Sequence, residues 1–231
     1  MKIISYSCQR IQAAAQMAPA CILNLALIAA VLGAVGCASS GHDKSESTAI
    51  SLQASADKIV KGQGIRDQML TALNDLVNNP QADLRPQFKK FTSAFSDFES
   101  IVKDVQGKVA SMQGKGAAYF EKWDADLAKI QNEDIRSRSL ARKSEVSDRF
   151  AKIKASYAKV GETFKPFMSN LTDIKTALST DLTRGGLDAI KPVVEKANKD
   201  AVPLREAVNE LVADFKAVGV AMSAVAPQPA K

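Results

Sequence analysis

The sequence predicts an all-α protein, an elongated antiparallel helical bundle with coiled-coil-like packing. Two observations predict this fold. Three stretches repeat apolar residues at alternating spacings of three and four, and each stretch is followed by residues that end helices. The composition agrees, because 46% of the 231 residues are hydrophobic and only 6% are aromatic, which suits helices packed through aliphatic side chains. We expect three long heptad-patterned helices plus a shorter first helix.

The shorter first helix is expected over residues 50–78. Its apolar stripe is irregular and includes an arginine; its members are Ile59, Arg66, Met69, Leu70, Leu73, Leu76 and Val77. Gly62 and Gly64 weaken its first half, because an interior glycine destabilises a helix by roughly 0.5–1 kcal/mol relative to alanine. The Asn-Asn-Pro sequence at 78–80 ends the helix.

The second helix carries the clearest heptad seam and is expected to end near residues 131–132. The seam consists of Phe88, Phe91, Phe95, Phe98, Val102, Val105, Val109, Met112, Gly116, Tyr119 and Trp123. Gly116 takes a seam position, where a missing side chain lets an aromatic ring of another helix approach. Tyr157 and Phe164 are the candidates for that ring.

The third and fourth helices repeat the pattern. The third seam is Val146, Phe150, Ile153, Tyr157, Val160, Phe164, Phe167, Leu171, Ile174 and Leu178, and the fourth runs from Leu187 to Met222. Pro166 and Pro203 are expected to kink these helices without ending them, because each seam continues in phase. Gly185 and Gly186 are expected to cap the third helix in a left-handed conformation. Short connections favour antiparallel neighbours within one chain, although an intermolecular coiled coil is the main alternative.

Residues 1–36 are typical of a signal peptide. An uncharged run of about 15 residues (21–35) follows Lys2 and Arg10 and is too short to span a bilayer comfortably. The sequence Ala-Val-Gly-Cys at 34–37 resembles the lipobox of bacterial lipoproteins, in which the cysteine becomes the first mature residue and is lipid-modified; that family usually has leucine where this chain has Ala34. We expect a membrane anchor through lipidated Cys37. Cleavage without lipidation and an uncleaved signal anchor are the alternatives.

The segment after the cysteine is expected to be a flexible tether, residues 37–49, because residues 38–49 are polar and small. The helical bundle domain is then expected over 50–225, and a disordered tail over 226–231. In the sorting pattern of Gram-negative lipoproteins, an aspartate next to the cysteine retains the protein in the inner membrane. Ala38 and Ser39 stand there instead, which by resemblance implies the outer membrane, facing the periplasm.

Charge and cysteine content restrict the partners. The formal charge is +6 for the whole chain and +4 after residue 36, which is too mild to indicate a nucleic-acid partner. Cys8 and Cys21 lie in the expected leader, so a mature chain with only Cys37 forms no internal disulfide.

A basic stretch at the start of the third helix is the candidate contact with anionic surfaces such as phospholipid headgroups or acidic wall polymer. Its candidate residues are Arg136, Arg138, Arg142, Lys143, Arg149 and Lys152. A solvated bundle face explains the same residues without any partner.

The groups needed for catalysis or metal binding are sparse. His42 is the one histidine, so a triad or a zinc site of the usual kind is not expected. The paired acids Asp124 with Asp126, and Glu133 with Asp134, fit polar helix faces and a helix N-terminus. We therefore expect no enzyme, no cofactor and no metal.

The stretch from Tyr119 to Phe215 carries a family resemblance. Its motifs are Tyr-Phe-Glu-Lys-Trp-Asp at 119–124, Arg-Ser-Arg-Ser-Leu at 136–140, Arg-Phe-Ala-Lys-Ile at 149–153, Phe-Lys-Pro-Phe-Met at 164–168 and Asp-Phe at 214–215. Together they resemble domain of unknown function family 2959, helical envelope lipoproteins. The resemblance implies a bundle in a lipoprotein context and brings no activity.

These observations lead to one main expectation about function: a non-enzymatic, lipid-anchored cell-envelope protein acting as a spacer, adaptor or partner-binding arm. The partner is expected to be an envelope protein or an anionic polymer. Binding of anionic envelope lipid or wall polymer through the basic third helix is the alternative. Carriage of an apolar ligand inside the bundle is a further possibility, and a core cavity would be its sign.

Overall fold

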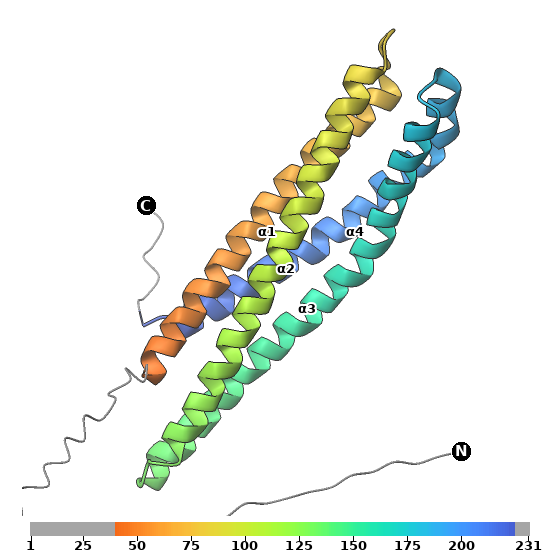
Figure 1. The fold of residues 1–231 in the computed structure, drawn as a ribbon. Coiled ribbons are helices and arrows are strands. Elements are labelled where there is room, and N and C mark those ends of the chain that lie inside the picture. The colour runs from red at the N-terminus through yellow and green to blue at the C-terminus, as the bar shows by residue number, and fades with distance from the viewer. Residues whose placement is uncertain (1–39, 225–231) are drawn as a thin grey trace, which may run out of the picture. The chain divides into compact units, whose positions relative to one another are not determined.

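The structure is a computed structural model that describes residues 40–224, and these form a four-helix bundle (Figure 1). The helices are α1 (Gly41–Asn78), α2 (Arg85–Leu127), α3 (Glu133–Thr180) and α4 (Arg184–Met222), and no strand occurs in this part of the chain. The predicted all-α bundle is confirmed. The expected leader, the lipidated Cys37 and the expected tail at 226–231 lie outside the described residues.

The four helices pack unequally. α1 packs most extensively against α2, α3 packs against α4, and α1 also lies against α4. α2 and α3 make few contacts although only residues 128–132 connect them. Figure 1 shows these two helices together at their shared hairpin and diverging away from it. The bundle is therefore closed on three sides and loosely packed on the fourth, between α2 and α3.

One hydrophobic core runs through the bundle and uses the predicted seams. Phe91, Phe95 and Met112 of α2 are almost completely buried, as are Phe167 and Leu171 of α3. The seam residues in the middle of α2 and α3 are only partly buried; they are Val102, Val105, Tyr157, Val160 and Phe164. Heptad spacing thus identified the inward face of each helix, but the separation of α2 from α3 leaves part of that face uncovered.

The start of α1 corrects the expected tether for residues 41–49, which are helical. Ser40 and Asp43 form a capping box: the Ser40 hydroxyl accepts a hydrogen bond from the Asp43 amide at 3.1 Å, and the Asp43 carboxylate accepts one from the Ser40 amide at 2.8 Å. Small residues then let α1 approach α4 closely. A Cβ built on Gly219 would lie 3.6 Å from the Ala49 carbonyl oxygen, and Ala49 is buried. With 38 residues, α1 is the shortest of the four helices, as expected, but it begins at Gly41 and is nearly as long as α4, with 39.

The other helix ends differ from the predictions in detail. α2 ends at Leu127, and α3 begins after Asn132, whose side chain caps the Ile135 amide. α3 continues through Pro166, as expected. Gly185 and Gly186 do not cap α3; they lie in the first turn of α4, and neither has a left-handed backbone. Gly186 is needed there for space, because a Cβ on it would lie 2.2 Å from the Asp181 carbonyl oxygen.

The described helices are also too polar to serve as membrane spans: none of α1 to α4 is long and apolar enough to cross a bilayer.

Candidate functional site

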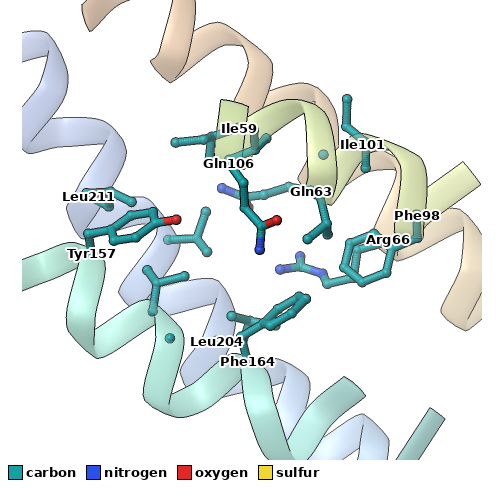
Figure 2. A pocket seen from close by; sticks show the side chains of 16 residues that line it. Ile59, Gln63, Arg66, Phe98, Ile101, Gln106, Tyr157, Phe164, Leu204 and Leu211 are labelled. Atoms are coloured by element: carbon teal, nitrogen blue, oxygen red, sulfur yellow. The ribbon is translucent and has the colours of Figure 1, made fainter. Parts of the chain in front are cut away.

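An apolar pocket of about 160 Å³ lies where the bundle is loosely packed (Figure 2). All four helices contribute to it. Buried residues of α1 and α4, including Ile59 and Leu204, form its floor. Partly exposed residues of α2 and α3, including Val102, Val105 and Phe164, form its rims. The pocket lies where α2 and α3 make few contacts, although Phe98 of α2 still meets Phe164 of α3, with ring centroids 6.2 Å apart.

Arg66 of α1 is the only charged residue that lines this pocket in the described part of the chain. Its side chain is only 2% exposed, and Figure 2 shows the guanidinium directed into the space between the helices. Nε and Nη2 donate hydrogen bonds to Oδ1 of Asp67, at 3.0 and 2.8 Å. Because a buried charge is costly without a partner, this pairing is what lets an arginine occupy the apolar stripe of α1.

The charge near Arg66 is not balanced by that pairing. Nη2 of Arg205, on α4, also donates to Oδ1 of Asp67, at 3.0 Å, so two guanidinium groups share one carboxylate. Nη1 of Arg66 has no hydrogen-bond partner among the described residues. Asp67 and Arg205 do not line the pocket, so in the described helices Arg66 alone brings charge to it, with one guanidinium nitrogen whose donors are unused.

The other polar groups of the pocket are neutral. Gln63, Gln106 and Tyr157 line it, and Figure 2 shows the Gln106 amide reaching into the pocket. Gln63 is held by a hydrogen bond to the Asn209 side chain at 3.0 Å. No carboxylate lines the pocket in this part of the structure. An arrangement of apolar walls, neutral amides and one guanidinium can bind an anionic group with an apolar extension.

The basic stretch predicted on the third helix is largely paired within the bundle. Arg142 and Arg149 both bind Glu145, at 2.6 and 3.0 Å, and together they hold the pKa of that carboxyl below its ordinary value. Arg136 pairs with Glu133, and Lys143 pairs with Asp124. Of the six predicted cations, only Arg138 lacks an ion-pair partner among the described residues.

Lys152 takes part in a structural network with α4. Its Nζ donates to Oδ1 of Asp214 at 2.7 Å, and the Ser156 hydroxyl donates to Oδ2 of the same carboxylate at 2.6 Å. Asp214 is buried, whereas Lys152 is exposed. The hydrogen bond and the negative charge of Asp214 raise the pKa of Lys152. Lys152 therefore joins α3 to α4 and is not a free cation.

The remaining candidate groups are placed as follows. His42 is exposed in the first turn of α1. Three of the four paired acids sit in ion pairs, Asp124 with Lys143, Asp126 with Lys122 and Lys129, and Glu133 with Arg136. Asp134 lies in the first turn of α3. No group of three or more His, Cys, Asp or Glu residues in the described helices is placed to hold a metal ion. Gly116 does face a ring, but the ring is Phe150, not Tyr157 or Phe164.

The pocket was not predicted from the sequence, although one residue carries a signal for it. Arg66 stands in the apolar stripe of the first helix, where a charged residue is out of place. An arginine at a core position indicates either a buried ion pair or a polar site. Its position alone did not show that α2 and α3 leave it facing a pocket.

The fold and the pocket define a helical-bundle protein with an interhelical apolar site. The chain belongs to the family described as protein of unknown function (DUF2959), whose model matches residues 37–218. The expected family is confirmed. No curated protein and no solved structure matches the chain.

Proposed function

We propose that this protein is a non-enzymatic, lipid-anchored component of the bacterial cell envelope whose helical bundle serves as a spacer, adaptor or partner-binding arm. Cys37 carries the lipid in this proposal, and the outer membrane, facing the periplasm, is the proposed location. The bundle supplies long, rigid faces, which suit a role in holding partners at a set position.

The lipobox at 34–37 is the observation that carries this proposal. The uncharged run before it has the length of a signal-peptide core, and Cys37 is the only cysteine after residue 21. The family match begins at Cys37 and leaves out residues 1–36. Signal cleavage just before Cys37 would give mature proteins that begin at the cysteine, and the region shared within the family begins there too.

Metabolic labelling with an alkyne-bearing fatty acid, followed by membrane fractionation, tests the anchor. The wild-type protein should incorporate the label and stay with the membrane, and Cys37→Ala should lose the label and enter the soluble fraction. Cys21→Ala is the matched control, because it removes a cysteine from the leader and should leave labelling unchanged. Label retained by Cys37→Ala would contradict the proposal.

In-cell crosslinking of the lipidated protein, followed by mass spectrometry, tests the adaptor role. Reproducible capture of a single envelope protein, with crosslinks confined to one face of the bundle, would support an adaptor. Capture of wall fragments or lipid alone would contradict the adaptor role and favour the second candidate below.

The second candidate is binding of anionic envelope lipid or wall polymer through α3. Arg138 is exposed and has no ion-pair partner among the described residues, and Ile135 and Leu140 are exposed beside it at the start of α3. Lys154, near the middle of α3, is also exposed and has no ion-pair partner in this part of the chain. A cation beside an exposed apolar side chain is typical of interfacial contact. This contact would be smaller than one formed by all six predicted cations, because five of them form ion pairs within the bundle.

Co-sedimentation with anionic vesicles, at low and high salt, tests this candidate. Reversal of both free cations, Arg138→Glu with Lys154→Glu, should abolish salt-sensitive binding. The double reversal Lys89→Glu with Lys216→Glu is the matched control, since it changes the net charge equally at exposed positions elsewhere. Equal loss in both double variants would show a general charge effect and count against α3.

A further inference from the structure

We propose that the pocket between α2 and α3 binds a fatty-acid-type ligand, an alkyl chain that ends in a carboxylate, with the carboxylate on Arg66. The walls are apolar, and the one charged group that faces the space is a guanidinium. The proposal does not depend on lipidation of Cys37 or on any protein partner, so it can fail separately from the proposed function.

The charge of the site selects an anion. Arg66 is the one charged residue that lines the pocket in the described part of the chain, and it shares its partner Asp67 with Arg205. A carboxylate would be attracted to the buried Arg66 guanidinium, and an alkylammonium group would be repelled by it. Nη1 of Arg66 supplies donors that Asp67 does not use. One anionic group can therefore bind at Nη1, the part of the Arg66 guanidinium that Asp67 leaves free.

The size of the site selects the apolar part. A volume of about 160 Å³ is close to that of an engineered apolar cavity of ~150 Å³ that binds benzene. Val102 and Val105 of α2, and Val160 and Phe164 of α3, offer the chain continuous apolar contact. Because these rim residues are only partly buried, the far end of a longer chain can leave the pocket between α2 and α3. Affinity should therefore rise about fourfold per methylene in short chains and then level off.

Two of the lining positions allow the pocket to be altered without disturbing the bundle. Arg66→Met removes the charge and keeps an unbranched apolar side chain, while Arg205 remains to pair with Asp67. Gly161→Leu fills the pocket, and a Cβ at Gly161 meets no atom within 4 Å. Gly107→Leu is the matched control on α2, because a Cβ there also meets nothing within 4 Å and Gly107 does not line the pocket.

The experiment uses the full-length protein in phosphatidylcholine nanodiscs and two photoreactive probes, a diazirine-bearing decanoate and its methyl ester. Mass spectrometry locates the labelled residues, and the concentration for half-maximal labelling measures affinity. We expect decanoate to label α2 and α3 beside Val102 and Val160. Arg66→Met should weaken decanoate labelling about tenfold or more, the effect of losing one charge-assisted hydrogen bond, and leave ester labelling unchanged.

Gly161→Leu should abolish labelling by both probes, and Gly107→Leu should change neither. Gly161→Leu keeps the test decisive if Arg66→Met fails to fold, and cooperative unfolding of each variant checks the fold. Equal labelling by decanoate and its ester in the wild type would overturn the role of Arg66. Labelling that survives Gly161→Leu would overturn the pocket. Protein crosslinks on α2 and α3 without probe labelling would make the occupant a partner helix and overturn the proposal.

Discussion

Gly116→Ala tests how closely α3 approaches α2, because the added methyl group has two opposing effects on the free energy of unfolding. A Cβ built on Gly116 lies 2.7 Å from Cε1 and 3.3 Å from Cζ of Phe150. Carbon atoms in contact are normally ~3.5–4.0 Å apart, so the ring would have to move by roughly an ångström. The Phe150 ring is also held by edge-to-face contact with Phe120, at a centroid distance of 5.4 Å.

The expected magnitude follows from the two effects. Glycine to alanine within a helix stabilises by roughly 0.5–1 kcal/mol when the new methyl group is unhindered. Overpacking a well-packed contact costs typically about 1–3 kcal/mol. Phe150 is only partly buried and can yield on one side, so the lower part of that range applies. Gly116→Ala should therefore unfold more easily than Gly107→Ala by about 1–2 kcal/mol.

Urea unfolding followed by circular dichroism measures this difference, with an unchanged slope as the sign that two-state unfolding is preserved. Gly107→Ala and Gly114→Ala are matched controls on the same helix, since a Cβ at either position meets nothing within 4 Å. In a double-mutant cycle, Phe150→Leu should recover most of the loss caused by Gly116→Ala. If Gly116→Ala stabilises the protein as much as the controls do, the close approach of Phe150 to α2 is refuted.

Three further predictions concern the helix ends and the α3–α4 network. Gly186→Ala should destabilise by about 1–3 kcal/mol in thermal melts, because the new Cβ meets a backbone carbonyl, and Gly185→Ala should not, since its nearest neighbour is a side-chain oxygen at 3.7 Å. Ser40→Ala should cost about 1 kcal/mol and increase hydrogen exchange at the start of α1. Hydrogen bonds from Ser40 lower the pKa of Asp43 in the folded protein. The stability that this cap contributes is therefore fully present above the ordinary carboxyl pKa of about 3.9, and it is lost as the pH falls through the lower pKa of the folded state. An NMR titration of the Asp43 carboxyl checks the sign. Asp214→Asn should lower the free energy of unfolding, measured in urea, by about 1–3 kcal/mol, because a buried carboxylate that accepts two hydrogen bonds is replaced. Lys152→Gln should lower it less, because Lys152 is exposed.

Heptad spacing predicted the long helices well, because apolar residues spaced alternately three and four apart share a face only in a helix, and that face packs into a common core. Phe91, Phe95 and Phe167 are buried as that spacing requires. The same reasoning failed at residues 41–49, where small polar residues read as a solvated tether. Thr48 and Ala49 are buried there, and Ala49 lies beside Gly219 of α4, which is distant in sequence.

The candidate site divides in the same way. Arg136 to Lys152 could be named as a basic stretch from the sequence, and Glu133 and Glu145 stand within one helical turn of three of these cations. The partners of Lys143 and Lys152 lie on other helices and could be assigned only from the structure. Asp214 is 62 residues from Lys152, and no local pattern links the two. In the structure, five of the six predicted surface cations form ion pairs with carboxylates of the bundle.

By itself, the sequence determined the fold class and the inward face of α2, α3 and α4, because periodicity is a local property. The anchor at Cys37 is a prediction that rests on the local spacing of the lipobox. Only the tertiary structure decided that α2 and α3 diverge, that Phe150 is the ring beside Gly116, and that Arg66 faces an apolar pocket. These features depend on how far apart helix axes lie along the bundle. That separation results from the sum of all side-chain contacts, and no single seam encodes it.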